Sequence, residues 1–202
     1  MSKKKKPELV DSIEEADGAA ASAVRPYRET VPIRALSFIS KLGDQPPLRA
    51  LCGVAITAGL VTRNDRLVRA GARALASHTL ATVVKDMIKH RVDRSRPNSN
   101  GGSKPTIKPG RSADKEETSF PSGHSAGAAA VAGAFARDFP EFRVAAYSAA
   151  GLVALAQVPR CSHYPSDVGA GIAIGLAADA AVAPLFPAAG KPLEDDNEIR
   201  RA

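Results

Sequence analysis

The chain has 202 residues and a formal net charge of +7, which suits one domain with tails and an anionic partner such as phosphate, a lipid headgroup or nucleic acid. Only 4% of the residues are aromatic and none is Trp, so the chain lacks the stacking residues of a nucleic-acid-binding protein. Its two Cys and four His residues show no spacing typical of a disulfide framework or a zinc site.

The two ends of the chain are predicted to be disordered tails. Residues 1–30 open with four lysines, continue with acidic residues and then become Ala-rich. They contain no long apolar run typical of a secretory signal, and their low hydrophobicity predicts disorder. The lysines suit either contact with an anionic membrane surface or simple solvation. Residues 188–202 are polar and predict a second tail.

A short amphipathic helix is predicted at Val31–Leu42. Apolar residues such as Ile33 and Leu36 share one face, and Arg34 and Lys41 lie between the apolar positions. This pattern is typical of a helix that lies in a membrane interface. The segment is too short and too charged to span a bilayer, and a stretch rich in Gly and Pro ends it.

Five apolar runs rich in Ala and Gly predict the helices of a bundle. They are Leu48–Thr62, Leu67–Ile88, Ser125–Ala136, Val144–Val158 and Val168–Phe186. Few of them reach the ~18–20 uncharged residues of a bilayer span, because charges such as Arg69, Lys85 and Asp179 interrupt them. Hydropathy alone leaves two interpretations open. One is a membrane bundle with small residues at close helix contacts, as in residues 169–175 (GAGIAIG), and the other is a soluble Ala-rich bundle.

One long segment between the apolar runs is predicted to be irregular. Residues 97–117 contain repeated Pro, Gly and Asn, and a loop of this length in a compact domain is usually functional or disordered. A flexible lid or a headgroup collar is the functional interpretation.

The sequence Pro121-Ser122-Gly123-His124 opens the apolar run that ends at Ala136. Pro suits the first turn of a helix, and Ser and Gly suit its cap. The backbone N–H groups of Ser122, Gly123 and His124 are therefore predicted to be free donors at the positive end of a helix, a natural site for an oxyanion. The imidazole of His124 adds a group that exchanges a proton near neutral pH.

Two further pairs of residues carry chemistry. Lys89 and Arg96 are seven residues apart, which predicts one helical face, and Pro97 is predicted to end that helix. Asp167 follows His163 by four residues, a spacing at which its carboxylate can hold the Nδ1 proton and leave Nε2 free. A cationic clamp, a helix-end cradle and an oriented His are the parts that phosphoryl transfer needs.

These residues resemble the pattern of the type-2 phosphatidic acid phosphatase superfamily, which is K-x6-R-P, then P-S-G-H, then S-R-x5-H-x3-D. Lys89 and Arg96 fit the first block, residues 121–124 the second, and His163 and Asp167 the end of the third. Three blocks in the family's order make the resemblance specific.

The resemblance covers about residues 33–187 and departs from the family at one place. Aligned on His163, the family's Ser-Arg pair falls on Ala156 and Gln157. An amide cannot supply the charge of a guanidinium. Arg160, three residues later, is the candidate replacement.

The resemblance implies an all-α membrane helical bundle of about five spans with an amphipathic N-terminal helix, formed by residues 31–187. It also implies a bacterial cytoplasmic membrane and an active site on the extracytoplasmic face. The positive-inside rule points the other way, because the segment that holds the first block is rich in Lys and Arg. Those charges have a substrate to bind, so we discount the rule here.

The implied activity is hydrolysis of a phosphomonoester or diphosphate on a lipid carrier through a phospho-histidine, with membrane lipids as the other partner. His163 would attack phosphorus, Asp167 would fix its tautomer, and His124 would protonate the leaving oxygen. The implied phosphate ligands are Lys89, Arg96, Arg160 and the amides of Ser122 and Gly123. No metal or cofactor is implied.

Two alternatives remain open from the sequence. The absence of the family's Arg is compatible with a non-catalytic lipid-phosphate binder, and the superfamily also contains soluble acid phosphatases and vanadium haloperoxidases. The residues that would select one lipid, such as undecaprenyl diphosphate or phosphatidate, carry no recognisable pattern.

Overall fold

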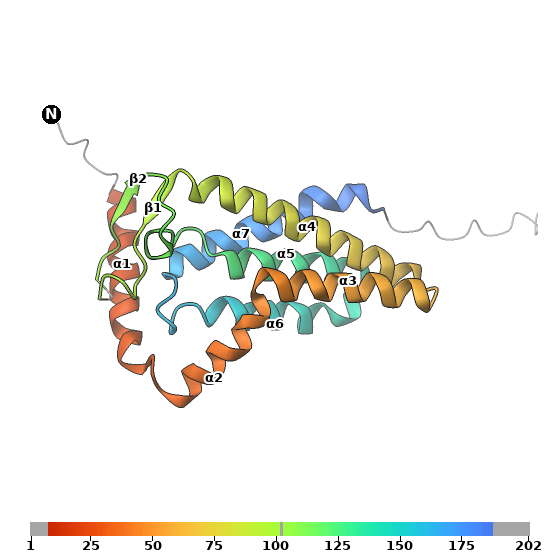
Figure 1. The fold of residues 1–202 in the computed structure, drawn as a ribbon, viewed down its shortest axis with the longest axis horizontal. Coiled ribbons are helices and arrows are strands. Elements are labelled where there is room, and N and C mark those ends of the chain that lie inside the picture. Colours follow the sequence, from red (N-terminus) through yellow and green to blue (C-terminus); the bar gives the residue numbers. More distant parts are fainter. Residues whose placement is uncertain (1–7, 102, 188–202) are drawn as a thin grey trace, which may run out of the picture.

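Within residues 8–101 and 103–187, the computed structural model contains seven α-helices, a two-stranded antiparallel sheet and short 3-10 turns (Figure 1). The helices are α1 (Glu8–Val24), α2 (Val31–Ser40), α3 (Gln45–Val61), α4 (Asp65–Lys89), α5 (Gly123–Asp138), α6 (Arg143–Leu155) and α7 (Pro165–Val182). The strands are β1 (Val92–Arg94) and β2 (Ile107–Pro109). The predicted tail at 188–202 and the first seven residues lie outside the described residues.

Helices α3 to α7 form a bundle with α5 at its centre. Each of the five predicted apolar runs is a helix, and α5 packs against α4, α6 and α7 (Figure 1). The core is built from small side chains: Ala126 and Ala130 of α5 meet Ala81 of α4 and Ala178 of α7. Such residues let helix backbones approach closely and gain dispersion contacts.

The closest approach is between α5 and α7. A Cβ atom at Gly171 would lie 2.4 Å from the carbonyl oxygen of Ser122, and one at Gly175 would lie 2.3 Å from that of Ala126. Both distances are far below a normal contact, so these two positions require Gly. A Cβ atom at Gly169 would meet nothing within 4 Å. The predicted small-residue contact in residues 169–175 is therefore confirmed at two of its three glycines.

The N-terminal segment differs from the prediction of a disordered tail. Residues 8–24 form α1, which packs across the end of the bundle and contacts α7 (Figure 1). Glu8 and Asp11 favour the helix because their charges lie in its positive first turn. The buried Asp17 has tertiary partners, described below, that composition alone does not reveal. The expectation of a tail was wrong for this part of the chain.

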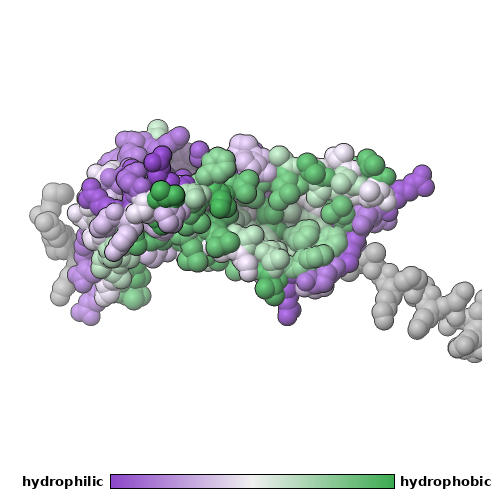
Figure 2. All heavy atoms as spheres, turned by 90° about the horizontal axis from the view of Figure 1, so that it is seen from below, coloured by the Kyte–Doolittle hydropathy of each residue, from purple (hydrophilic) through white to green (hydrophobic). Residues whose placement is uncertain are grey.

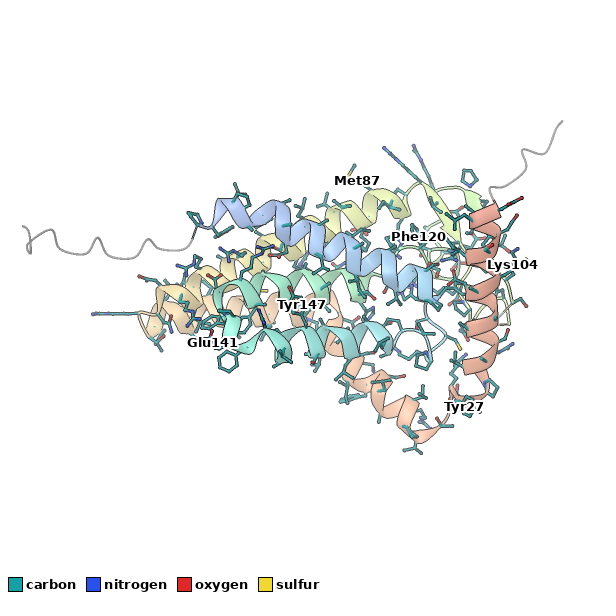
Figure 3. All side chains as sticks on the ribbon, turned by 180° about the vertical axis from the view of Figure 1, so that it is seen from behind. Tyr27, Met87, Lys104, Phe120, Glu141 and Tyr147 are labelled. Carbon is teal, nitrogen blue, oxygen red and sulfur yellow. The ribbon has the colours of Figure 1, made fainter. Side chains whose placement is uncertain are left out.

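The segment after α4 also differs from the prediction. Helix α4 ends at Lys89, and residues 92–94 form β1, so Lys89 and Arg96 do not share a helical face. The segment predicted to be irregular contains β2, which pairs with β1. The Nζ atom of Lys104, a residue of this segment, lies 3.8 Å from a carboxylate oxygen of each of three residues of α1, which are Asp11, Glu14 and Glu15 (Figure 3). These contacts tie the segment to the bundle end as a collar.

The surface of the bundle is apolar between two polar ends. Hydrophobic residues cover the helices in Figure 2, and hydrophilic residues gather at the end that holds α1 and at the opposite tip. Exposed apolar side chains include those of Val54, Leu60, Val144, Leu155 and Leu185. In the described residues, Pro165–Leu185 is the one helical segment long and apolar enough to cross a membrane. The expected number of about five spans stays a prediction.

Candidate active site

The segments that carry the polar residues of the three family blocks lie at the end of the bundle beside α1 (Figure 1). These residues come from the first turns of α5 and α7, the loop before α7, the end of α4, and the segment after β1. Ser122 and Gly123 at the start of α5, and Pro165 at the start of α7, are residues that suit a helix N-terminus, and both N-termini lie at this end.

The imidazole of His163 is held in one orientation. The side chain is 3% exposed, and its Nδ1 lies 2.7 Å from the carbonyl oxygen of Ser119. A carbonyl only accepts, so Nδ1 carries the proton and Nε2 carries the lone pair. The nearest oxygen of Asp167 is 3.7 Å from Nδ1. The carbonyl of Ser119, rather than the predicted carboxylate, is therefore the closer partner of the ring.

The surroundings of His163 keep it neutral. Burial lowers its pKa from the ordinary 6.5 to about 4. The carboxylate of Asp167 opposes this decrease, and the cations of Arg96 and Lys89 add to it. A buried imidazole that is neutral at physiological pH has the unprotonated nitrogen that a nucleophile requires.

Asp167 is fully buried and organises the loop around His163. It accepts hydrogen bonds from the hydroxyl of Ser119, from the backbone N–H of Tyr164 at 2.9 Å, and from Arg94, with which it forms an ion pair. Its bond to the Tyr164 amide is part of the cap of α7. Asp167 thus holds the backbone on both sides of the His163 ring as well as lying near it.

Arg94 connects Asp167 to α1. Its guanidinium is 2% exposed, pairs with Asp17 at 2.5 Å on the side away from Asp167, and lies 4.8 Å from the centre of the Tyr164 ring. Asp17 also accepts from the backbone N–H of Ser166 at 3.0 Å. Sequence reasoning missed this chain of contacts, because Asp17 and Arg94 belong to no family block. Asp17 is one of five acidic residues in residues 8–24, so no signal in the sequence singled it out.

The start of α5 forms the predicted cradle with one change. Ser122 is the N-cap, and its hydroxyl accepts from the amide of Ser125. The amide of Ser122 donates to the carbonyl oxygen of Asp167 at 3.0 Å, so it is not a free donor as predicted. Gly123 and His124 occupy the first two helical positions, where an amide has no partner inside its own helix. These two amides are the donors left for an oxyanion.

His124 has a carboxylate partner from a distant part of the sequence. Its Nε2 lies 2.7 Å from Asp44, which caps α3 and is half exposed. Asp44 carries no recognisable pattern, so sequence reasoning missed it. Sequence spacing indicated a carboxylate partner only for His163, and the fold provides one for His124 as well. Burial lowers the pKa of His124 below its ordinary value, and the carboxylate of Asp44 opposes this decrease by favouring the protonated form.

The two cations of the first block come together although they do not share a helix. Lys89 Nζ donates to the carbonyl oxygen of Thr118 at 2.5 Å, and Arg96 donates to the carbonyl oxygens of Lys115 at 2.5 Å and Ser162 at 3.1 Å. Both act electrostatically on the ring of His163. Backbone carbonyls orient these side chains without neutralising them, so their charge remains available for an anion.

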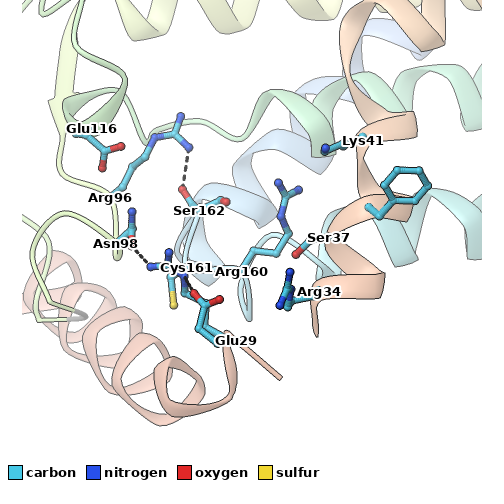
Figure 4. A pocket seen from close by; sticks show the side chains of 12 residues that line it. Glu29, Arg34, Ser37, Lys41, Arg96, Asn98, Glu116, Arg160, Cys161 and Ser162 are labelled. Atoms are coloured by element: carbon cyan, nitrogen blue, oxygen red, sulfur yellow. Dashed lines mark hydrogen bonds and ion pairs between the residues drawn. The ribbon is translucent and has the colours of Figure 1, made fainter. Parts of the chain in front are cut away.

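Gln157 and Arg160 are in contact but differ in burial. Gln157 is fully buried, and its side-chain amide donates to the carbonyl oxygen of Val153 at 2.8 Å. Its side-chain oxygen accepts from the guanidinium of Arg160 at 3.5 Å. Arg160 follows the end of α6, donates to the hydroxyl of Ser40, and lines a cavity together with Arg96 (Figure 4). Its charge also acts on His124.

A cavity of about 470 Å³ opens beside these residues (Figure 4). Five basic and two acidic side chains line the cavity. Three of the lining residues, Arg96, Arg160 and Ser162, come from the end of the bundle that holds the candidate site. The remaining basic residues come from α2 and the turn before it. The volume falls within the range of small-molecule sites. No group of three His, Cys, Asp or Glu residues in the described part of the chain is placed to hold a metal ion.

The fold and these residues define a class of helical-bundle proteins that gather histidines and cations at one end of the bundle. Residues 70–191, more than half of the chain, match the family model of the PAP2 superfamily, the type-2 phosphatidic acid phosphatases. The chain belongs to this superfamily, as the three sequence blocks indicated.

Similar proteins are known for both the sequence and the fold. The lipid A 1-phosphatases of Rhizobium etli and Rhizobium johnstonii are each 49% identical to the chain over 57 residues. That match covers 28% of this chain, and it spans about a quarter of the length of these curated relatives, 25% and 23%. A transmembrane PAP2-type phosphatidylglycerolphosphate phosphatase from Bacillus subtilis shares the fold, with a TM-score of 0.61 and 24% identity over 88% of this chain and 86% of that one.

Proposed function

We propose that this chain is a lipid phosphatase that releases phosphate from a phosphomonoester or diphosphate on a lipid through a phospho-histidine. The observation that carries the proposal is the state of His163: a neutral, buried ring with Nδ1 tied to a carbonyl and Nε2 free. This is the state of a nitrogen nucleophile poised beside an anion-binding cluster. Membership of the PAP2 superfamily supports the same reaction class.

In the first step Nε2 of His163 attacks phosphorus. A P–N bond forms and the P–O bond to the lipid breaks, with its electron pair leaving on the lipid oxygen. His124 supplies the proton to that oxygen, exchanging its contact with Asp44 for one with the leaving group. In the second step the neutral His124 takes a proton from water, whose oxygen attacks phosphorus. The P–N bond breaks with its electron pair returning to Nε2 of His163, and inorganic phosphate leaves with both histidines in their starting states.

The negative charge that develops on phosphorus is met by fixed donors. Lys89, Arg96 and Arg160 supply positive charge, and the amides of Gly123 and His124 supply two N–H groups at the positive end of α5. In this scheme, charge neutralisation by side chains performs the task that Mg²⁺ performs in many phosphoryl-transfer enzymes, so we expect activity without added metal.

The exposed apolar surface between the two polar ends of the bundle, here called the apolar belt, supports a membrane location for this reaction. Helices α3 to α7 would lie in the bilayer, α2 would lie at its surface, and the active site would open at the headgroup level on the extracytoplasmic face. A lipid phosphate could then reach His163 while its chains stay among the exposed apolar side chains of the bundle.

The test is phosphate release by the purified protein in neutral detergent, with phosphatidate, phosphatidylglycerophosphate and undecaprenyl diphosphate as substrates and a chelator present throughout. We expect turnover on at least one substrate, complete loss in His163→Ala, and no loss in His90→Gln, which changes an exposed histidine outside the site. Acid-labile phosphate trapped on an active His163→Ala protein would contradict the assignment.

The leaving group separates the role of His124 from a structural one. His124→Ala should reduce turnover of a lipid substrate far more than turnover of p-nitrophenyl phosphate, whose leaving group needs little protonation. An equal loss on both substrates would make His124 structural. If wild-type protein binds lipid phosphate but releases none, the chain is a binder, and the replacement of the family's Arg by Gln157 becomes the explanation.

A further inference from the structure

The cavity beside the active site contains more positive charge than the transferred phosphate needs. Arg34 and Lys41, both from the α2 region, line it across from Arg96 (Figure 4), and Arg160 also lines it. A phosphomonoester carries a charge of about −1.5 to −2 at pH 7, which Lys89, Arg96 and Arg160 already neutralise. The charges of Arg34 and Lys41 are surplus to the reaction.

Arg34 and Lys41 are not held in ion pairs within the fold. Within residues 8–101 and 103–187, no carboxylate lies within ion-pair distance of Arg34 or Lys41. Arg28 of the same cavity differs, because it pairs with Glu29 at 3.1 Å. Both side chains are exposed, and Lys41 also lies over the ring of Phe38, 5.7 Å from its centre. Their charges are therefore available to an anion that enters the cavity.

The spacing on α2 places these groups together. Arg34, Ser37 and Lys41 follow one another at three and four residues, so they share one helical face and turn it to the cavity. The hydroxyl of Ser40 binds Arg160 and fixes this face against the active site. The α2 face is thus a second anion-binding wall next to the first.

Apolar residues next to this face of α2 indicate that the occupant is a lipid. Val31, Phe38, Ile39 and Leu42 are exposed apolar residues, and Phe38 also lines the cavity at its rim. An anionic group held by Arg34 and Lys41 would have hydrocarbon surface directly beside it. This arrangement suits a headgroup whose chains leave over α2.

We propose that Arg34 and Lys41, with Ser37, form a subsite for a second anionic group of the substrate, so that the preferred substrates are lipid phosphomonoesters or diphosphates with two anionic groups in one headgroup. The inference rests on the proposed function for the identity of the first phosphate. It goes further by assigning specificity to α2, which contributes no residue to the three family blocks.

The experiment compares two substrates with identical acyl chains in neutral detergent: phosphatidylglycerophosphate, which has two anionic groups, and phosphatidate, which has one phosphomonoester. We expect the ratio of their kcat/KM values to fall about tenfold in Arg34→Gln and again in Lys41→Gln, since each removes a charge-assisted hydrogen bond. Arg143→Gln, an exposed cation at the far end of the bundle, is the control and should leave the ratio unchanged. An unchanged ratio in Arg34→Gln and Lys41→Gln would overturn the subsite.

Two additional arms separate the possible failures. Binding of methylenediphosphonate and of inorganic phosphate, measured by calorimetry, tests the subsite without turnover, and the preference for the diphosphonate should vanish in the double variant even if no lipid is hydrolysed. The kinetic comparison is repeated in vesicles that contain anionic phosphatidylglycerol. A loss that appears only in those vesicles, and equally for both substrates, would show that α2 binds the bilayer and would overturn the assignment to the substrate.

Discussion

At the scale of single residues, the proposed mechanism depends on the contrast between the two histidines of the site. His163 is buried, bonded to a carbonyl and neutral, whereas His124 is a quarter exposed and paired with Asp44. Two imidazoles in different surroundings can divide the roles of nucleophile and proton donor, as pairs of titratable groups do in many enzymes. Each role depends on a partner remote in sequence.

The depressed pKa of His163 predicts a pH dependence of stability. Between pH 6.5 and about 4 the unfolded chain binds a proton at this residue that the folded chain does not, so folding loses stability as the pH falls through that window, by up to about 3 kcal/mol. Above pH 6.5 the residue contributes no pH dependence. Thermal unfolding of wild type and His163→Gln in detergent at pH 7 and pH 5 checks this. The wild type should lose more stability on acidification, and parallel losses would contradict the shifted pKa.

Arg160 is predicted to replace the missing guanidinium of the family. Arg160→Ala should lower kcat/KM by about 10²–10³, as Arg96→Ala should, because each removes a charge from the transition state. Gln157→Arg added to Arg160→Ala should restore part of the rate, because the Gln157 oxygen already lies 3.5 Å from the Arg160 guanidinium. A silent Arg160→Ala would refute the compensation.

At the scale of elements, α1 is a brace for the catalytic loop. It connects to Asp167 through Asp17 and Arg94, and it faces the first turn of α7 through Ser166. Asp17, Arg94 and Asp167 are buried, so their contacts are little screened by solvent. Helix α1 therefore acts on His163 through position and not by touching the substrate.

Asp17→Asn is predicted to lower kcat with little change in KM. The substitution removes the charge that holds Arg94 on the side away from Asp167, and the loop around His163 should lose order. Steady-state kinetics with phosphatidate checks the split, and Glu15→Gln on the exposed face of α1 is the matched control. Equal effects of the two substitutions would show that α1 has only a surface role.

The close contact between α5 and α7 leads to a second prediction at this scale. Gly175→Ala would force a Cβ atom against the carbonyl oxygen of Ala126 and should cost about 1–3 kcal/mol of stability. Gly169→Ala on the same helix meets open space and should be neutral or slightly stabilising. Thermal unfolding in detergent compares the two variants. Equal stability would mean that the helices separate at no cost.

At the scale of the whole molecule, charge is distributed by end. The active-site end carries the cationic cavity and the collar, and the opposite end carries a buried cluster in which Arg73 pairs with Asp138 at 2.8 Å, with Glu141 nearby (Figure 3). An apolar belt lies between them (Figure 2). This distribution suits a protein that meets water on both sides of a bilayer.

Orientation can be measured at Ser103, an exposed residue of the collar. In Ser103→Cys, a membrane-impermeant maleimide should label the protein in intact cells, because the active-site end is expected to face outwards. The native Cys52 and Cys161 are both buried, so they give little background. Labelling only after lysis would place the site on the cytoplasmic face.

The sequence by itself determined the five helices of the bundle and the superfamily. Apolar runs of at least twelve residues have one way to satisfy their backbone while burying small side chains, so all five runs are helices. The blocks at residues 89–96, 121–124 and 163–167 are local patterns of residue types, and they identified the superfamily before any geometry was known. Local patterns of this kind need no knowledge of the fold.

Only the tertiary structure decided which groups serve these blocks. Asp17 contacts Arg94, which lies 77 residues later in the chain, and Asp44 contacts His124, which lies 80 residues later. The carbonyl oxygen of Ser119 accepts the hydrogen bond from Nδ1 of His163 that sequence spacing assigned to Asp167. A buried charge is stable only with a partner, and that partner is chosen by where the chain returns in space. For the same reason, α1 is a helix and not a tail: the contacts that hold it come from residues far along the chain.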